Sequence, residues 1–181
     1  MTNVLITGGT GFIGGHTARV AAQRGHEVIV LDRYAHLDKK IEAERRYRYL
    51  SPHNVAVYCG DVCDPVAVTE FASKVDGIIH LAACLGTQET ITNPHPALTV
   101  NMIGGVNVLQ AVRQYGIPLA YIGVGNHWML NSYAITKTAI EHFIGMYRAE
   151  HGIRDNIVHL VNACGPNQSI APPYGPAKVR K

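Results

Sequence analysis

Short apolar runs alternate along this chain with longer stretches in which apolar residues recur every three or four positions. The short runs predict six strands. The first begins at Val4 and ends at Gly8, and the others are Glu27–Leu31, Val55–Tyr58, Gly77–Leu81, Leu119–Val124 and Ile157–Val161. The longer stretches predict helices over Phe12–Arg24, Ala35–Leu50, Val66–Lys74, Ala97–Tyr115 and Asn131–His151. This alternation is typical of an α/β protein with a doubly wound parallel sheet and helices on both faces.

The ends of several predicted helices carry their own signals. Gly25, Gly116 and Gly152 follow three of the helical stretches, where glycine commonly ends a helix. Asp64 followed by Pro65 has the form of an N-cap residue and a proline at the first helical position. There is no internal repeat, and 181 residues suffice for one ordinary domain with one core.

The segment from Val4 to Gly15, VLITGGTGFIGG, predicts a strand, a tight turn and the start of a helix. Gly8, Gly11 and Gly14 bring bare backbone N–H groups and a helix N-terminus to one point, which favours an anion, most often a pyrophosphate. Their GxxGxxG spacing is one residue longer in its first gap than the GxGxxG dinucleotide fingerprint. The prediction therefore depends on the surrounding residues.

Those surroundings favour a dinucleotide. Asp32 ends the second strand 18 positions after Gly14, close to the spacing of about 20 at which an acidic residue meets the adenosine ribose. Its charge would repel a 2′-phosphate, which favours NAD over NADP, although Arg33 beside it would soften that repulsion. The alternative interpretation is that Asp32 is only a turn residue. Small residues at Ala82 and Ala83 would let a flat ligand lie against the end of the fourth strand.

Charge and composition indicate which compartment and which classes of partner to expect. The net charge is +3, and the basic run from Lys39 to Arg48 is interleaved with Glu42 and Glu44, which favours a solvated helix face over a nucleic-acid site. No apolar run approaches the roughly 20 residues of a membrane span, and no signal peptide is recognisable. We therefore expect a soluble, cytoplasmic protein that binds neither nucleic acid nor membrane.

The cysteines and the one strand histidine are interpreted as structural. The spacing of Cys59 and Cys63 is not that of a zinc site, and we expect no metal. The four cysteines suit a reducing compartment and are expected to be small buried apolar residues. His80 lies alone in an apolar strand and is expected to be a core residue whose hydrogen bonds are satisfied.

Tyr133 and Lys137 form a YxxxK pair at the start of the last long helix, where this spacing places both on one face. A lysine ammonium nearby, together with an oxidised nicotinamide, would lower the pKa of the tyrosine hydroxyl from about 10. Tyr133 could then take a proton from a substrate hydroxyl as hydride leaves the same carbon. A second YxxxK, at Tyr174 and Lys178, is surrounded by prolines and is interpreted as coincidence.

Together these motifs resemble the extended short-chain dehydrogenase/reductases, specifically the NAD-dependent epimerase/dehydratase group that acts on nucleotide sugars. The resemblance rests on six motifs in order: TGGTGFIG, Asp32, GDVCD from Gly60, IHLAA from Ile79, VNMIGGVNVLQA from Val100 and YAITK from Tyr133. It implies a Rossmann domain with NAD at Gly8, Gly11, Phe12, Ile13 and Gly14.

The resemblance also assigns roles to single residues. It implies that Asp32 and Arg33 lie at the adenosine ribose, that Asp61 and Val62 lie at adenine, and that the cofactor continues along Leu81, Ala82 and Ala83. It implies that Lys137 holds the nicotinamide ribose as well as tuning Tyr133, and that Asn101 is largely structural. Asn162 and Gly165-Pro166 match the stretch where the family begins to contact substrate.

Two departures from the family concern the substrate side. The family places Ser or Thr just after the fifth strand, where this chain has Ile122-Gly123-Val124-Gly125-Asn126, so that only Asn126 offers a polar side chain. The family also continues for more than a hundred residues that form a substrate lobe. We expect a Rossmann domain over 1–165 and a Pro/Gly-rich tail over 166–181, a possible remnant of that lobe, in either a fragment or a naturally short protein.

Two functions follow from the sequence. The first is an NAD-binding oxidoreductase-type protein with Tyr133 as acid/base and Lys137 as its partner, acting on a nucleotide sugar that the sequence does not identify. The alternative is a non-catalytic NAD-binding or regulatory module. The family commonly dimerises through its two long helices, so we expect a homodimer through 97–115 and 131–151.

Overall fold

The computed structural model describes residues 2–33, 50 and 53–168. Its centre is a six-stranded parallel sheet with the strand order β3-β2-β1-β4-β5-β6. The strands are β1 (Asn3–Thr7), β2 (Glu27–Asp32), β3 (Val55–Cys59), β4 (Gly77–His80), β5 (Leu119–Val124) and β6 (Asp155–Leu160). This is the doubly wound order of a dinucleotide-binding sheet, and it confirms the predicted fold class.

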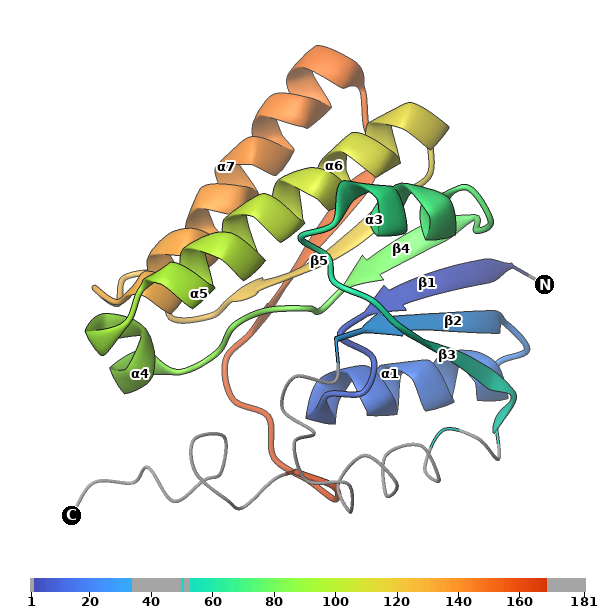
Figure 1. Ribbon diagram of the computed structural model, residues 1–181, viewed down its shortest axis with the longest axis horizontal. Coiled ribbons are helices and arrows are strands. Elements are labelled where there is room, and N and C mark those ends of the chain that lie inside the picture. The colour runs from blue at the N-terminus through green and yellow to red at the C-terminus, as the bar shows by residue number, and fades with distance from the viewer. Residues whose placement is uncertain (1, 34–49, 51–52, 169–181) are drawn as a thin grey trace.

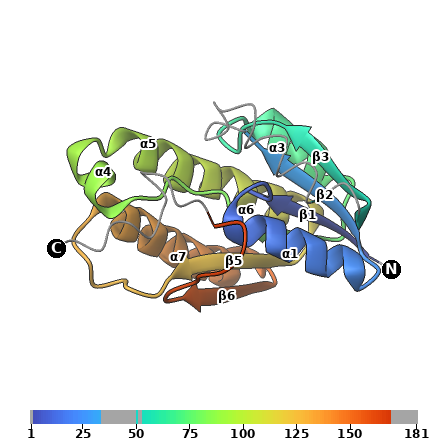
Figure 2. The ribbon, with the colours of Figure 1, turned by 90° about the horizontal axis from the view of Figure 1, so that it is seen from below.

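Helices cover both faces of the sheet (Figure 1). Figure 2 shows α1 on one face, with α6 and α7 on the other side. The helices are α1 (Phe12–Gln23), α3 (Pro65–Ala72), α4 (Thr87–Thr92), α5 (His95–Ala97), α6 (Gly104–Tyr115) and α7 (Ser132–His151), with a π-helical segment, η2 (Leu98–Ile103), between α5 and α6. No helix in the described part of the chain is both long and apolar enough to cross a membrane.

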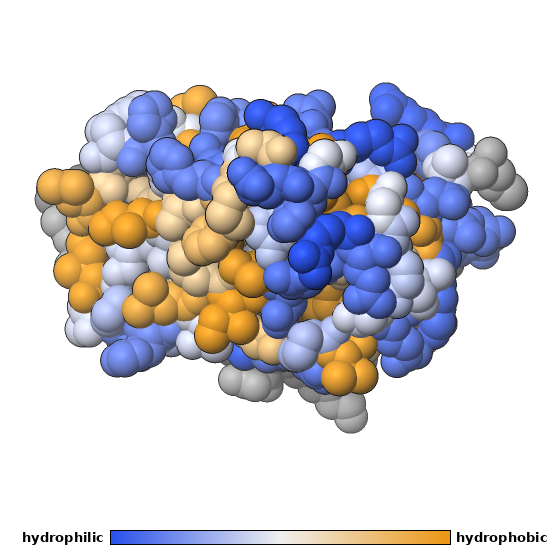
Figure 3. All heavy atoms as spheres, turned by 90° about the horizontal axis from the view of Figure 1, so that it is seen from above, coloured by the Kyte–Doolittle hydropathy of each residue, from blue (hydrophilic) through white to orange (hydrophobic). Residues whose placement is uncertain are grey.

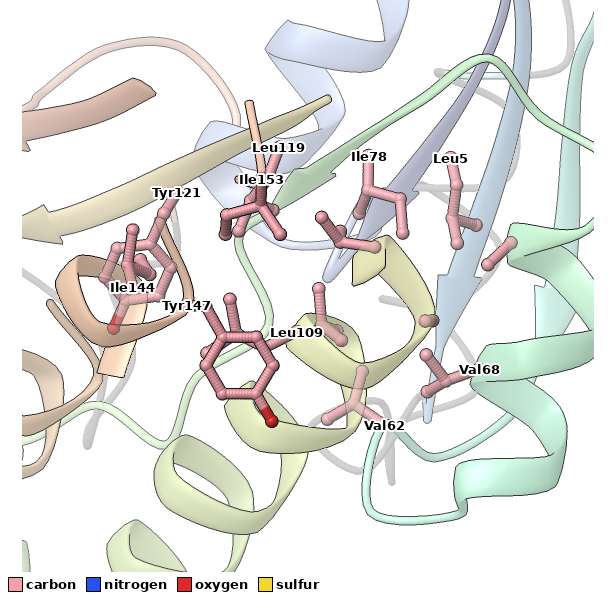
Figure 4. Packing of buried hydrophobic residues seen from close by; sticks show 14 of the residues in the cluster. Leu5, Val62, Val68, Ile78, Leu109, Leu119, Tyr121, Ile144, Tyr147 and Ile153 are labelled. Atoms are coloured by element: carbon pink, nitrogen blue, oxygen red, sulfur yellow. The ribbon is translucent and has the colours of Figure 1, made fainter. Parts of the chain in front are cut away.

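The sheet separates two apolar clusters. The larger lies between the sheet and the helices α3, α6 and α7, and Figure 4 shows side chains from strands and helices meeting there. The smaller cluster lies on the α1 face and includes Ile6, Ala18 and Val30, all fully buried. Burial of apolar side chains on both faces of a parallel sheet explains why its strands read as continuous apolar runs.

Local signals fix several element ends as predicted. The Asp64 carboxylate accepts a hydrogen bond from the Val66 N–H at 2.9 Å, which caps α3 with Pro65 in its first turn. Gly116 and Gly152 end α6 and α7 with φ of 63° and 62°, the left-handed conformation that glycine adopts without strain.

The structure differs from the sequence prediction in the helix expected over 97–115. That stretch begins as α5, widens into η2 and becomes regular only at α6. The helix α4 was not predicted because its sequence, TQETIT, has no clear apolar period. The sixth strand begins two residues earlier than predicted, and the helix predicted over 66–74 ends at Ala72.

The expectation that all four cysteines are buried is wrong. All four are free thiols, but Cys59 and Cys164 are exposed, and Cys63 and Cys84 are only half-buried. They lie at the ends of strands or in the segments that follow, where the chain leaves the core, so their small apolar side chains do not ensure burial. His80, in contrast, is buried, with a hydrogen bond between its Nδ1 and Thr7 Oγ1 at 2.6 Å.

Several predictions fall outside the described residues. They concern most of the helix over 35–50, the basic run over 39–48, the second YxxxK and residues 169–181 of the tail. The division of the chain at residue 165 stays a prediction.

Candidate functional site

The glycine turn joins β1 to α1 at the carboxyl edge of the sheet. Gly8 has a φ of 72°, and a Cβ there would lie 2.7 Å from the Ala82 backbone nitrogen, so only glycine lets the turn approach β4 this closely. A Cβ on Gly14 would overlap the Gly8 carbonyl oxygen. Gly11 is the N-cap of α1 and contributes no capping side chain, which leaves the first N–H groups of α1, at Phe12 and Ile13, near one point. This arrangement can bind an anion.

Asp32 is directed at the same turn. Its Oδ2 accepts hydrogen bonds from the Thr10 backbone N–H at 3.0 Å and from the Thr10 hydroxyl at 2.6 Å, and the residue is 8% exposed. The carboxylate therefore braces the glycine turn as well as lying where a ribose is expected. Thr10 was not identified from the sequence, although a threonine between two of the motif's glycines was the available signal.

Arg33 and Asp61 connect the ends of β2 and β3. Arg33 Nη1 lies 3.2 Å from Asp61 Oδ2, and Asp61 Oδ1 accepts a hydrogen bond from the Cys63 N–H at 2.9 Å. Burial raises the pKa of Asp61, but the hydrogen bonds from Cys63 and the Arg33 charge more than offset it, so the pKa lies below its ordinary value. This pair and the buried Val62, which the resemblance assigns to the adenosine end of the cofactor, follow the carboxyl ends of β2 and β3.

The end of β4 is tied to β1 and to the helical layer. The Leu81 N–H donates to the Thr7 carbonyl at 3.1 Å, and the Ala82 N–H donates to the Thr7 hydroxyl at 3.3 Å. Farther along, Asn101 Oδ1 accepts from the Cys84 N–H at 2.7 Å. The segment Leu81–Ala83 therefore follows β4 along the sheet edge, next to the glycine turn.

Asn101 links this segment to α7. Its Nδ2 donates to the Cys84 carbonyl at 3.3 Å and to the Thr136 hydroxyl at 2.9 Å, and the residue is buried. Asn101 lies in the π-helical segment η2, where the wider turn is a common accommodation at functional sites. The structural role that the resemblance implied for this asparagine fits these contacts.

Tyr133 and Lys137 lie in the first turns of α7, which begins after Asn131. The Asn131 side chain caps the helix by accepting a hydrogen bond from the Ala134 N–H at 2.9 Å. Lys137 is 3% exposed, and its Nζ lies 4.0 Å from the centre of the Tyr121 ring. Burial lowers the pKa of Lys137 to about 7, although the Glu141 carboxylate acts in the opposite direction.

The expected lowering of the Tyr133 pKa by Lys137 is not seen. Burial raises the pKa of the Tyr133 hydroxyl above its ordinary value, where the sequence reasoning expected a lowering. The ammonium of Lys137 lies over another tyrosine, and its own charge is disfavoured by burial. The expected lowering also invoked an oxidised nicotinamide, so it does not arise from the spacing of YxxxK alone.

A pocket of about 110 Å³ lies beside Tyr133. It brings together Tyr133 and Asn126, whereas Asn162 is exposed and does not line it. The pocket is lined by Val124, Gly125, Asn126, Met129, Asn131, Tyr133, Ala134, Leu160 and Val161. Since the Asn131 side chain caps α7, Tyr133 and Asn126 are the polar side chains of this lining that remain for a ligand.

Two glycines at the strand end beside this pocket are closely packed. A Cβ on Gly125 would lie 2.8 Å from both the Leu160 carbonyl oxygen and Val161 Cα. A Cβ on Gly123 would overlap the Glu141 carboxylate and lie 2.6 Å from the His159 ring. The backbone after β5 and in β6 is therefore too close for a side chain at Gly125, whereas a side chain at Gly123 would require the Glu141 and His159 side chains to move.

The segment after β6 returns to the glycine turn. His16 Nε2 lies 2.9 Å from the Pro166 carbonyl oxygen, and a Cβ on Gly165 would be in ordinary contact with the Phe12 ring. The structure thus brings Gly165 and Pro166 beside α1. Within the described residues, no group of three or more His, Cys, Asp or Glu side chains could hold a metal ion.

Known proteins with similar sequences point to one family. The sequence profile of the NAD dependent epimerase/dehydratase family matches residues 4–126. The chain is 25% identical over 186 residues to the dTDP-glucose 4,6-dehydratase of Mycobacterium tuberculosis, with 92% of this chain and 55% of that protein covered. It is 30% identical over 123 residues to the UDP-glucose 4-epimerase of Caenorhabditis elegans, with 64% of this chain and 35% of that protein covered.

Two solved structures of UDP-glucose 4-epimerases have a similar fold. The UDP-glucose 4-epimerase of Thermus thermophilus, in complex with NAD, has a TM-score of 0.82 and 28% identity, and the match covers 96% of this chain and 59% of that one. The UDP-glucose 4-epimerase of Thermotoga maritima has a TM-score of 0.84 and 23% identity, and the match covers 96% of this chain and 60% of that one. The chain spans little more than half the length of the dehydratase and of these two structures.

Proposed function

Because the chain belongs to the NAD dependent epimerase/dehydratase family, we propose that it binds NAD and exchanges hydride with a nucleotide-sugar hydroxyl, with Tyr133 as acid/base. Family membership confirms the resemblance inferred from the motifs, and NAD is the cofactor that the family's description names. The single observation that carries the proposal is that the glycine turn, Asp32 and the start of α7 with Tyr133 and Lys137 each lie at or follow the carboxyl end of a parallel strand of one sheet. In doubly wound sheets ligands bind at that edge.

The residues at the edge fit NAD in their order and in their chemistry. The Gly11 N–H donates to the Gly8 carbonyl at 3.1 Å, whereas the N–H groups of the first turn of α1, from Phe12 on, have no side-chain cap and suit a pyrophosphate; Asp32 suits ribose hydroxyls. The backbone of Leu81–Ala83, close to Gly8, offers a flat surface for the rest of the cofactor. Asp32 is acidic, and Arg33 is paired with Asp61, so neither group is available to receive a 2′-phosphate. NAD is therefore favoured over NADP.

The proton chemistry is assigned to Tyr133. Bound NAD would supply a hydride acceptor, and Tyr133 would accept the proton of the substrate hydroxyl. For that, its raised pKa has to fall, and a charged Lys137 is the nearby group whose electrostatic field would lower it. Asn126, in the same pocket, would donate an amide hydrogen bond to the reacting oxygen.

The substrate class comes from the relatives. The proteins compared above are named for dTDP-glucose and UDP-glucose, so a nucleoside diphosphate sugar is the proposed substrate class. The chain spans little more than half of the dehydratase, and the matched part is the one that holds the glycine turn and Tyr133.

A non-catalytic NAD-binding module is the second candidate. Two observations favour it: the stretch Ile122–Asn126 carries no hydroxyl side chain, and the pKa of Tyr133 is raised. Loss of one hydrogen-bond donor at a reacting oxygen typically lowers kcat by about 100-fold or more. Such a module would keep the glycine turn and Asp32 intact.

We also propose that the chain forms a homodimer through α6 and α7 with the segment before them. Figure 3 shows apolar areas among hydrophilic ones on the face seen from above. Exposed apolar side chains on these elements include Leu98, Ile103, Ile135 and Met146, with exposed fractions between 46% and 57%. Packing against the same elements of a second copy would remove them from water.

The experiment that tests the activity mixes the protein with NAD and a panel of UDP-, GDP- and dTDP-sugars. We expect NADH absorbance or a changed sugar with at least one of them, and we expect Tyr133→Phe to abolish turnover while it leaves NAD affinity unchanged. Equal turnover by Tyr133→Phe would reject the assignment of the acid/base. Clear NAD binding without turnover of any sugar would favour the non-catalytic module.

A further inference from the structure

Tyr121 contacts Lys137 at two places. Its ring lies under the Lys137 ammonium, with 4.0 Å between Nζ and the ring centre. Its hydroxyl donates a hydrogen bond to the Lys137 backbone carbonyl at 3.2 Å. Tyr121 is 1% exposed and lies in β5, within the large core cluster that Figure 4 shows. One side chain from the sheet thus contacts both the charged end and the backbone of the lysine.

Because Lys137 is buried, the contact with the Tyr121 ring affects whether its side chain is charged. Lys137 is buried, and burial disfavours an ammonium unless nearby groups compensate. The electron-rich face of an aromatic ring attracts a cation, and this attraction is strongest where water is excluded. The ring of Tyr121 is therefore one of the few features that favour the charged form at this position.

The other titratable groups around Lys137 come from three elements. On α7 itself, Tyr133 lies one turn before it, and the Glu141 carboxylate one turn after it favours the ammonium. From β6, His159 Nε2 contacts Glu141 Oε2 at 3.0 Å. From β4, His80 lies with its ring centre 5.8 Å from that of Tyr121, and burial, followed by the Lys137 charge, lowers the pKa of His80 to about 3. His80 is therefore neutral and adds no competing charge.

We propose that Tyr121 is a positioning residue that holds the Lys137 side chain in place and favours its ammonium form, one helical turn from Tyr133, the proposed acid/base. The ring supplies the attraction, and the hydroxyl fixes the turn of α7 that carries the lysine. The consequence for function rests on the role proposed above for Lys137. The contact itself is independent of cofactor and substrate.

The test measures the pKa of Lys137 by NMR titration of protein labelled in its lysine side chains. The signal of Lys137 is assigned by its absence in Lys137→Met. In Tyr121→Leu, which removes the ring, we expect the pKa to fall by about one unit, a tenfold change in the protonation equilibrium. In Tyr121→Phe, which keeps the ring and loses only the hydroxyl, we expect a shift of a few tenths at most.

Tyr147→Leu is the matched control. Tyr147 is also a buried tyrosine of the same core, but its hydroxyl contacts Gln110 Nε2 at 2.7 Å. We expect it to destabilise the fold comparably and to leave the pKa of Lys137 unchanged. An unchanged pKa in folded Tyr121→Leu, or an equal fall in Tyr147→Leu, would overturn the proposal.

A second substitution covers the case in which Tyr121→Leu does not fold. Replacing Tyr121 with a ring-fluorinated phenylalanine keeps the shape of the ring but withdraws electrons from its face. We expect a lower pKa of Lys137 than in Tyr121→Phe, and equality of the two would overturn the proposal. Because these readouts need neither NAD nor substrate, absence of NAD binding or turnover in the unaltered protein would count against the proposed function only.

Discussion

At the scale of one residue, burial of Lys137 changes its pKa and thereby the pH dependence of stability. Burial lowers its pKa from 10.5 to about 7, so between these values the folded chain binds fewer protons than the unfolded one. Stability therefore rises with pH across that window, by up to about 1.4 kcal/mol per pH unit. Below the folded-state pKa both states are protonated, so the contribution of Lys137 to stability no longer changes with pH.

We predict that this slope disappears in Lys137→Met. Denaturant unfolding of both proteins at about pH 6, 7.5 and 9 measures it, since contributions common to the two cancel in the difference. The free energy of unfolding of the unaltered protein should rise with pH relative to the variant. Parallel curves would mean that Lys137 keeps an ordinary pKa in the fold.

At the scale of an element, the glycine turn that connects β1 to α1 is tightly packed. A Cβ on Gly14 would overlap the Gly8 carbonyl, and such overpacking costs about 1–3 kcal/mol. We predict that Gly14→Ala lowers the free energy of unfolding by this amount.

Gly145→Ala is the matched control, because Gly145 lies within α7 with nothing within 4 Å of its Cβ position. Alanine is the better helix former, so this substitution should raise stability by about 0.5–1 kcal/mol. Denaturant unfolding measures both changes. Equal effects of the two substitutions would show that the turn is not tightly packed.

These elements also show which features the sequence could predict. Strands, glycine stops and the Asp64 cap were predicted because each depends on local pattern and backbone conformation. The widening of η2 around Asn101 was not, since it accompanies contacts with Cys84 and Thr136 far along the chain. The candidate site residues were identified from their spacing. The hydrogen bonds from Thr10 to Asp32 and the contact of Tyr121 with Lys137 were missed, because each joins residues of different elements.

At the scale of the whole molecule, the residues proposed to hold NAD all lie in the described part of the chain, whereas of the two asparagines proposed for substrate only Asn126 lines the pocket of about 110 Å³ beside Tyr133. That difference agrees with a chain that spans little more than half of its relatives. The exposed apolar side chains of η2 and α7 belong to the helical layer on one face of the sheet and favour self-association.

We predict that light scattering at micromolar concentration gives a mass of two 19.7 kDa chains. Met146→Glu would place a charge in the proposed interface and should shift the mass towards the monomer. Val20→Glu is the control, because Val20 lies on α1, across the sheet, and is also partly exposed. A monomeric unaltered protein, or equal effects of both substitutions, would contradict the proposed dimer.

The edge formed by the glycine turn and Asp32 is the proposed NAD site. Calorimetric titration of the protein with NAD tests it most directly, with NADP as the competing ligand and Gly11→Val as the variant. Gly11 has an ordinary φ of −68°, and the nearest atom to a Cβ there is the Gly8 carbonyl oxygen at 3.1 Å, so the valine mainly fills the proposed pyrophosphate space. We predict saturable NAD binding, weaker NADP binding and at least a tenfold loss of NAD affinity in a folded Gly11→Val, about 1.4 kcal/mol. Absence of NAD binding, or equal affinity in Gly11→Val, would contradict the account.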